Sequence, residues 1–281
     1  MLKIKNIYIL KYGLIIAVFS FLINIIVYFQ YAIDDIIFLE HIYFNMVEDG
    51  SKLDIYYIKD ASDNRRITSI SFPEKPQEFS FIVLDDPITS SQEHAHYNYN
   101  KIKLTIYIPK YLDKTENKIT LTKAIVKFDN GTEQEFSLGN ITLFKNVDFL
   151  NYFNTIDTRG DDLYYTTKVA RQDSTIKFIG NEYYEELSDI VHMKINNISA
   201  EELIFPFKIN KGGKLTIESQ LDISENDSRR YNVYNIDNYI NFEASDSIDG
   251  YEYLHNISYA PFDYLSPERE IVNFLKYKGV K

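Results

Sequence analysis

The sequence predicts an all-β protein in which two tandem antiparallel β-sandwiches of the immunoglobulin-like kind follow a single N-terminal transmembrane helix. Three observations lead to this prediction. An uncharged, mostly aliphatic run lies near the N-terminus, apolar and polar residues alternate through most of the remaining chain, and the alternating segments are short. Cysteine is absent, so apolar burial rather than disulfide bonds must hold the predicted sandwiches together.

The uncharged run spans Tyr12–Ile33, and its length matches the roughly 20 residues that a membrane-spanning helix needs. Leu, Ile, Val and Phe dominate it, so its summed insertion free energy is on the order of −5 kcal/mol. A cleaved signal peptide is the alternative, but Gln30-Tyr31-Ala32 offers no small-residue cleavage pattern. We therefore predict an uncleaved anchor whose partner is the lipid bilayer.

The charges that flank the run predict its orientation. Three lysines and no acidic residue precede it, whereas Asp34, Asp35 and Glu40 follow it. Because basic residues are retained on the cytoplasmic side, residues 1–11 are predicted to be cytoplasmic and the rest extracytoplasmic. The abundance of Ile, Asn, Lys and Tyr indicates an AT-rich bacterial genome. The predicted location is thus a bacterial cell membrane, crossed once.

The charge of the chain excludes some partners. The whole chain carries −11 and its first 33 residues contribute +3, so the remainder carries −14. Such acidity opposes binding to nucleic acid or to anionic lipid headgroups. The predicted partner outside the membrane is instead a protein or a polysaccharide of the cell envelope.

Residues 34–145 are predicted to form the first sandwich, because short segments with a period of two recur through them. The clearest hairpin joins Ile119–Phe128 to Glu133–Phe144, and Asn130-Gly131 between them supplies the positive φ angles of a tight turn. The other predicted strands in this part are Lys52–Ile58, Ile67–Phe72, Phe79–Leu84 and Ile102–Ile108.

The pattern changes at residues 146–162, where Phe149, Leu150, Phe153 and Ile156 are spaced more like a helix. We predict a connector with a short helix here. Residues 163–281 then form the second sandwich, and Ser266-Pro267-Glu268 opens a C-terminal helix that ends near Tyr277. The predicted strands are Leu163–Ala170, Thr175–Ile179, Ile190–Ile195, Leu203–Ile209, Leu215–Ile223, Tyr231–Phe242 and Tyr251–Tyr259. One larger continuous β domain is the alternative, because the connector is neither rich in Pro, Gly and Ser nor strongly charged.

One stretch resembles a known class of module. Ile190–Ser199, Phe205-Pro206-Phe207 and Lys211–Ile217 follow the strand, "NNxS", strand, "GGxLxI" order of immunoglobulin-like modules on bacterial envelope proteins. The similarity covers about 30 residues, most of them turn residues. It implies a sandwich fold and no ligand.

Candidate metal sites are few. Glu93 precedes His94-Ala95-His96, and two imidazoles at this spacing share one face of a strand, within reach of one metal ion. No third ligand is identifiable, so solvated loop histidines are the simpler interpretation. Asp246–Gly250 resembles part of a calcium loop but lacks the glutamate at position twelve, and a turn is the simpler interpretation.

A catalytic pattern also fails on its context. Ser174-Thr175-Ile176-Lys177 fits the S-x-x-K of penicillin-binding proteins and β-lactamases, Ser62-Asp63-Asn64 fits their S-D-N, and Lys211-Gly212-Gly213 approximates their K-T-G. In that family the serine opens a helix, whereas Ser174 begins a segment with strand periodicity. Ser62 also precedes Ser174 when it should follow. Arg159-Gly160-Asp161 is an integrin-type tripeptide that we attribute to chance.

The aromatic content is unusual, with 24 Tyr, 19 Phe and no Trp. Tyrosine is common on recognition surfaces, although strands also favour it. The absence of Trp weakens a carbohydrate-binding hypothesis without excluding it. The tyrosines that we single out as a possible binding face are Tyr97, Tyr99, Tyr164, Tyr165, Tyr183, Tyr184, Tyr231, Tyr234 and Tyr239.

The sequence therefore predicts a membrane-anchored, extracytoplasmic, non-catalytic binding or accessory module. The alternative is an extracytoplasmic hydrolase that uses carboxylate or histidine-metal chemistry, so enzyme activity stays open with the balance against it. No catalytic, cofactor-binding or metal-binding residue is assigned, and no cofactor is predicted. A concave pocket with convergent carboxylates or histidines would favour the hydrolase.

Overall fold

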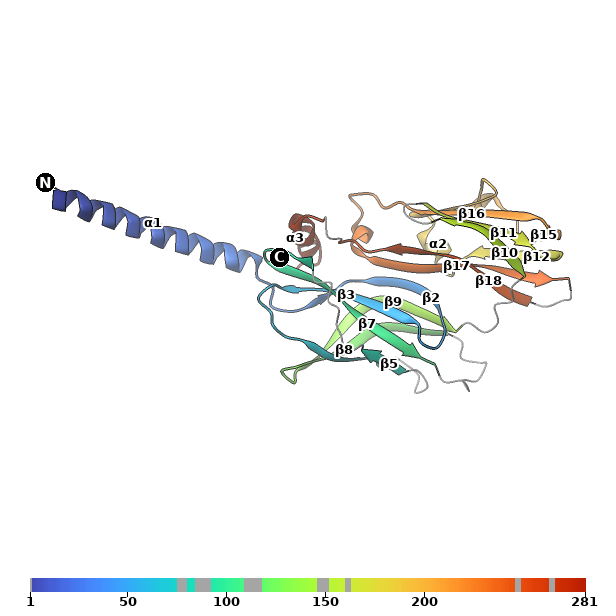
Figure 1. Ribbon diagram of the computed structural model, residues 1–281, viewed down its shortest axis with the longest axis horizontal. Coiled ribbons are helices and arrows are strands. Elements are labelled where there is room, and N and C mark those ends of the chain that lie inside the picture. The colour runs from blue at the N-terminus through green and yellow to red at the C-terminus, as the bar shows by residue number, and fades with distance from the viewer. Residues whose placement is uncertain are drawn as a thin grey trace.

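Strands dominate the computed structural model, which describes residues 2–74, 80–83, 92–108, 118–145, 152–159, 163–245, 249–262 and 266–281. The predicted all-β class is confirmed. Most strand pairs are antiparallel, as expected for short segments with a period of two. The strands form an elongated body, and the N-terminal helix α1, Leu2–Tyr31, projects from one end of it (Figure 1).

The predicted membrane anchor needs correction. Within the described part of the chain, no helix combines the length and the apolar character that crossing a membrane requires. A membrane span needs about 20 consecutive apolar residues in one helix. This finding overturns the anchor over Tyr12–Ile33. It also overturns the cell-membrane localisation, the cytoplasmic N-terminus and the extracytoplasmic remainder that were predicted from it.

Two sheets are built from one predicted half of the chain each. The first sheet has the order β1-β3-β7-β5, with β6 also paired to β7. Its strands are β1 Ile37–Phe38, β3 Lys52–Asp60, β5 Ser80–Val83, β6 Gln92–Glu93 and β7 Tyr97–Tyr107. The second has the order β10-β11-β16-β13-β14. Its strands are β10 Phe153–Arg159, β11 Leu163–Ala170, β13 Val191–Ile195, β14 Ile198–Ser199 and β16 Lys214–Leu221. All pairs in these two sheets are antiparallel.

A third sheet takes strands from both halves, in the order β15-β12-β17-β2-β9-β8-β4, with β18 also paired to β17. We call it the shared sheet. Its strands are β2 His41–Val47, β4 Ile67–Ser71, β8 Lys118–Phe128, β9 Glu133–Lys145, β12 Ser174–Gly180, β15 Phe207–Ile209, β17 Val233–Ala244 and β18 Asp249–Tyr259. Strand β2 joins the two halves, because it pairs in parallel with β9 on one side and with β17 on the other.

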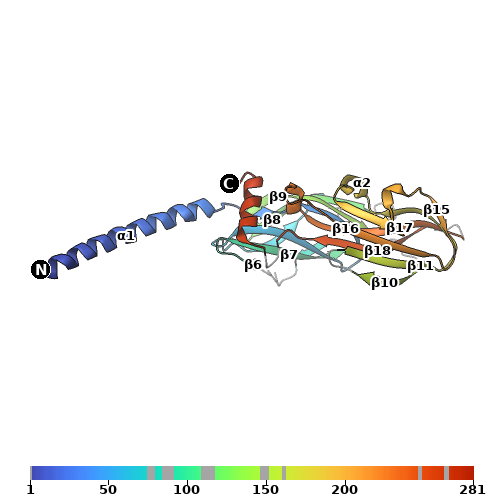
Figure 2. The ribbon, with the colours of Figure 1, turned by 90° about the horizontal axis from the view of Figure 1, so that it is seen from above.

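Apolar cores lie between the sheets. The first core combines side chains of β3 and β7 with those of β2, β8 and β9, and helix α3, Glu268–Tyr277, adds Ile271, Phe274 and Leu275. The second core combines β13 and β16 with β12, β17 and β18. A third, smaller cluster lies at the junction, where Phe44 of β2 and Ile236 of β17 meet residues that flank the short helix α2, Tyr184–Leu187. Figure 2 shows α3 beside the base of α1.

Part of the predicted connector, residues 146–162, differs from the expected short helix. Phe153–Arg159 is strand β10, paired with β11, whereas residues 146–151 and 160–162 lie outside the described residues. Only Phe153 of this strand reaches the second core, so the pairing rather than an alternating pattern sets its conformation. The β8–β9 hairpin is confirmed, with Lys127 opposite Glu133. In its turn Gly131 has φ +83°, and Asn130 Oδ1 accepts hydrogen bonds from the amide and hydroxyl of Thr132.

Candidate binding pocket at the junction of the sheets

The histidines of the predicted metal pair have separate roles. Glu268 Oε1, in the first turn of α3, lies 2.8 Å from His96 Nδ1 and also accepts the His96 backbone N–H. The His96 ring stacks on Tyr31 at the end of α1, 4.5 Å between centroids. His94 Nε2 is buried and has no hydrogen-bond partner among the described residues. No group of three or more metal-ligating side chains occurs in the described ranges.

The other sequence motifs do not converge. Ser174 begins β12 in the shared sheet, and its hydroxyl donates to Gln172 O. Ser62 lies in the turn after β3 and donates to Asp60. Lys211 N donates to Asp173, as a turn residue does. The candidate calcium loop and the Arg-Gly-Asp tripeptide extend into positions outside the described residues, which are 246–248 and 160–162.

Most of the tyrosines that the sequence singled out are structural. Tyr97 and Tyr99 are buried in the first core. The Tyr183 hydroxyl lies 2.6 Å from Thr142 Oγ1, and the Tyr164 hydroxyl bonds both the N–H and the C=O of Ser258. Tyr234 is also buried, but it contributes to a pocket at the junction of the two halves.

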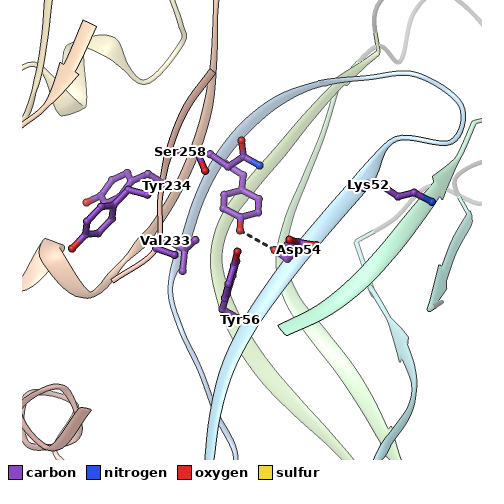
Figure 3. A pocket seen from close by; sticks show the side chains of 10 residues that line it. Lys52, Asp54, Tyr56, Val233, Tyr234 and Ser258 are labelled. Carbon is purple, nitrogen blue, oxygen red and sulfur yellow. Dashed lines mark hydrogen bonds between the residues drawn. The ribbon is translucent and has the colours of Figure 1, made fainter. Parts of the chain in front are cut away.

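This junction pocket has a volume of about 170 Å³. It lies where β3 approaches β17 and β18, so its walls come from segments about 180 residues apart in sequence. Figure 3 shows Asp54 and Tyr56 projecting from β3 toward Val233, while Lys52 points away from them. The lining residues are Tyr43, Lys52, Asp54, Tyr56, Val233, Tyr234, Asn235, Ser258, Tyr259 and Ala260.

The alternation of residues along β3 explains which of its side chains line this pocket. Leu53 and Ile55 point into the first core, so the alternate residues Lys52, Asp54 and Tyr56 lie on the opposite face of the strand. Tyr43 enters from β2, and its hydroxyl donates to Asp54 O at 2.8 Å. This bond ties the floor of the pocket to its wall.

Charge inside the pocket is balanced internally. Lys101 Nζ lies 2.7 Å from Asp54 Oδ2 and 5.6 Å from the centre of the Tyr56 ring. Burial alone would lower the pKa of Lys101, but its bonds to Asp54 and Tyr56 raise it above the ordinary value. Burial raises the pKa of Tyr43 and of Tyr56. Burial therefore keeps both phenols neutral at neutral pH, and Asp54 is paired with Lys101.

A polar clasp supports one wall of the pocket, and we define it as Asn45, Asn235, Asp237 and Asn256. Asn235 Oδ1 accepts from the side-chain amides of Asn45 and Asn256, at 3.1 and 2.5 Å. Asp237 accepts from Asn256 and from Met46 N, at 2.8 and 2.7 Å. Burial raises the pKa of Asp237, and these hydrogen bonds oppose that shift. The clasp fixes β2, β17 and β18 relative to one another.

A second polar group is enclosed in the other half. Lys168 Nζ and Glu252 Oε1 are 2.7 Å apart, and their side chains are 5% and 9% exposed. His255 is buried nearby, and burial followed by the charge of Lys168 lowers its pKa to about 4. A β-bulge makes Leu254 the extra residue between the Asn238–His255 and Tyr239–Tyr253 pairs, and both Leu254 and His255 are buried. Because Lys168, Glu252 and His255 are enclosed, a substrate in solution cannot reach them.

Sequence reasoning missed the pocket because its residues are ordinary in isolation. Lys52, Asp54 and Tyr56 alternate as any half-buried strand does, and Ser258 and Tyr259 end another strand. Only Tyr234 had been singled out. No local pattern in the sequence predicts that β3 and β17 lie side by side, so the pocket could not be predicted from the sequence.

Comparison with known proteins gives little. No family model matches the chain, and no curated protein matches it. Among solved structures, one match is a chain from a structure described as "Complete structure of manganese lipoxygenase of Gaeumannomyces graminis and partial structure of zonadhesin of Komagataella pastoris". It is 8% identical, covers 82% of this chain and 96% of its own, and has a TM-score of 0.19. At that score the likeness supports no statement about fold or function.

Proposed function

We propose that this protein is a non-catalytic binding module and that the junction pocket anchors one group of a partner molecule. The observation that carries the proposal is the pocket itself. Aromatic and hydrogen-bonding side chains from β2, β3, β17 and β18 converge there, as in small-molecule sites that combine apolar walls with few polar groups. The polar clasp and the Tyr43 bond hold this arrangement in place.

We also propose that the chain folds as two β-sandwiches of the immunoglobulin-like kind that share one sheet. The separate apolar cores support this, since each lies between a sheet of its own half and part of the shared sheet. The junction pocket would then lie between the two sandwiches and be lined mainly by strand residues of both halves.

The chemistry of the described residues favours binding over hydrolysis. Asp54 is the carboxylate that lines the junction pocket, and Lys101 already pairs with it. A general acid or base needs a partner positioned toward the substrate, and the pocket lining contains no histidine. His96 and Glu268 bond each other at the base of α1, and His255 lies in an enclosed core.

The test is to obstruct the pocket without touching its floor. Ser258 is exposed at the rim, so Ser258→Phe in the full chain should fill the opening. A matched control is Ser69→Phe, because Ser69 is an exposed strand serine on β4 outside the pocket. Saturation-transfer NMR with a mixed library of small neutral, cationic and anionic fragments should detect binders of the wild-type chain. Their signals should fall at least fivefold with Ser258→Phe and persist with Ser69→Phe.

Two results would contradict the proposal. One is a set of fragments that binds equally well to wild type and to Ser258→Phe; the other is no fragment binding to the wild-type chain. Circular dichroism and the urea midpoint should match among the three proteins, which separates obstruction from misfolding. If Ser258→Phe is destabilised, Ala260→Leu offers a second obstruction, because Ala260 also lines the pocket.

A further inference from the structure

We propose that the junction pocket accepts a single neutral, polyhydroxylated ring, such as the terminal sugar residue of a glycan. This inference rests on the proposed binding function and names the ligand class of the same pocket. Three properties of the pocket support it: its charge balance, its unused hydrogen-bonding groups and its volume.

Charge argues for a neutral ligand. Lys101 occupies the cation position beside Asp54 and near the Tyr56 ring, so an incoming cationic group would meet a charge of its own sign. An anionic group would approach the carboxylate of Asp54 instead. Lys52 also lines the pocket, but it does not offset this, because its amine is 2.7 Å from Thr105 Oγ1 and is directed away from Asp54 (Figure 3).

Three residues that line the pocket carry polar groups whose hydrogen-bonding capacity is not fully used in the described part of the chain. The side-chain amide of Asn235 receives two hydrogen bonds at its oxygen, and no acceptor for its N–H groups occurs in the described part of the chain. Asp54 Oδ2 pairs with Lys101, which leaves Oδ1 as an acceptor. The exposed Ser258 hydroxyl can donate and accept. Sugar hydroxyls also donate and accept, so a ring with several hydroxyls can satisfy such a mixed set.

Size restricts the ligand to one ring. A volume of about 170 Å³ holds roughly five or six waters at about 30 Å³ each. That space admits one terminal residue rather than a chain. Tyr259 is partly exposed and lines the pocket, and its ring gives a flat apolar surface against which the C–H face of a sugar can pack. Tyrosine thus takes the place of the tryptophan that this chain lacks.

The experiment uses the full chain and methyl glycosides of glucose, galactose, mannose and N-acetylglucosamine in saturation-transfer NMR. Parallel samples contain N-acetyl methylamides of lysine, aspartate and tyrosine, which represent cationic, anionic and aromatic peptide groups. At least one glycoside should bind with a Kd on the order of 1 mM, because one small ring makes few contacts. Ser258→Ala, which removes one unused hydroxyl from the rim, should weaken it about fivefold. Ser69→Ala is the matched control, because Ser69 is an exposed strand serine outside the pocket.

Each outcome decides between the two proposals. Glycoside binding that Ser258→Phe abolishes and Ser258→Ala weakens supports both proposals. Binding by a peptide probe alone, lost in Ser258→Phe, overturns the sugar ligand and leaves the binding function standing. Glycoside binding that neither variant changes places the sugar elsewhere and overturns this inference. Absence of binding by every probe contradicts both proposals.

Discussion

At the scale of single residues, two buried histidines make the stability of this fold depend on pH. His41, on β2, lies 3.1 Å from Leu138 O through Nδ1 and accepts the backbone N–H of Tyr56 at Nε2. Burial lowers its pKa to about 4, although its backbone hydrogen bonds oppose the shift. Protonation of His41 would put a proton on Nε2, and this N–H would then face the backbone N–H of Tyr56. His255, in the other half, has a pKa of about 4 for the same principal reason.

Acid should therefore destabilise the fold. Between pH 6.5 and about 4 the unfolded histidines bind protons that the folded ones do not, so stability falls as pH falls. The full shift corresponds to about 3 kcal/mol for each histidine. Urea unfolding at pH 7 and pH 4.5 measures this loss. We expect His255→Phe to lose less stability on acidification than wild type does.

The matched control for that comparison is His192→Phe, because His192 is exposed on β13. It should respond to acid as wild type does. Buried acids such as Glu252, whose pKa burial raises, contribute in the opposite direction, so only the difference between variants isolates the histidine. Equal acid sensitivity in wild type and His255→Phe would contradict the assignment.

At the scale of elements, β2 depends on a glycine in the neighbouring strand. Gly139 lies in an irregular part of β9, opposite His41 of β2, with φ +85°. A Cβ there would lie 2.6 Å from His41 O and 2.8 Å from His41 N. Only glycine allows the two backbones to approach this closely. The parallel pairing of β2 and β9 therefore needs this residue.

Gly139→Ala should lower the free energy of unfolding by about 3 kcal/mol or more, because backbone strain and a clash with backbone atoms add. Gly131→Ala is the matched control, since Gly131 has φ +83° with no atom within 4 Å of the added Cβ. It should cost only about 1 kcal/mol of strain. Urea denaturation measures both. Similar losses in the two variants would show that the close approach at His41 is unimportant.

At the scale of the whole molecule, the shared sheet couples the two halves. β17 pairs with β2 through residues 233–236 and with β12 through residues 239–244, so one strand contributes to both parts of the sheet. Helix α3, although it ends the chain, packs on the first core. Separation of the halves would expose apolar surface and break the β2–β17 ladder. We expect the halves to unfold together.

Leu121→Ala in the first core and Ile217→Ala in the second test this coupling. Both side chains are fully buried, and each truncation should cost about 2–5 kcal/mol. Each variant should shift the same single urea transition, followed by far-UV circular dichroism and by tyrosine fluorescence. Two transitions, each moved by only one of the variants, would instead indicate independently folding halves.

Local patterns in the sequence determined much of the secondary structure. Alternation located β3, β11 and β18, Asn130-Gly131 located the β8–β9 turn, and Ser266-Pro267-Glu268 located the start of α3. These features depend on residues close in sequence, whose periodicity and backbone preferences can be read directly. The all-β class follows from them.

Tertiary structure alone decided how those strands combine. Strand β2 was not predicted, because His41–Val47 has buried residues on both faces and shows no clean alternation. Without β2 the shared sheet cannot be inferred, and neither can the meeting of β3 with β17. The junction pocket depends on that meeting, since Asp54 and Asn235 are about 180 residues apart. Local composition does not indicate which distant segments will pair. The strands were therefore predictable from the sequence, and the pocket was not.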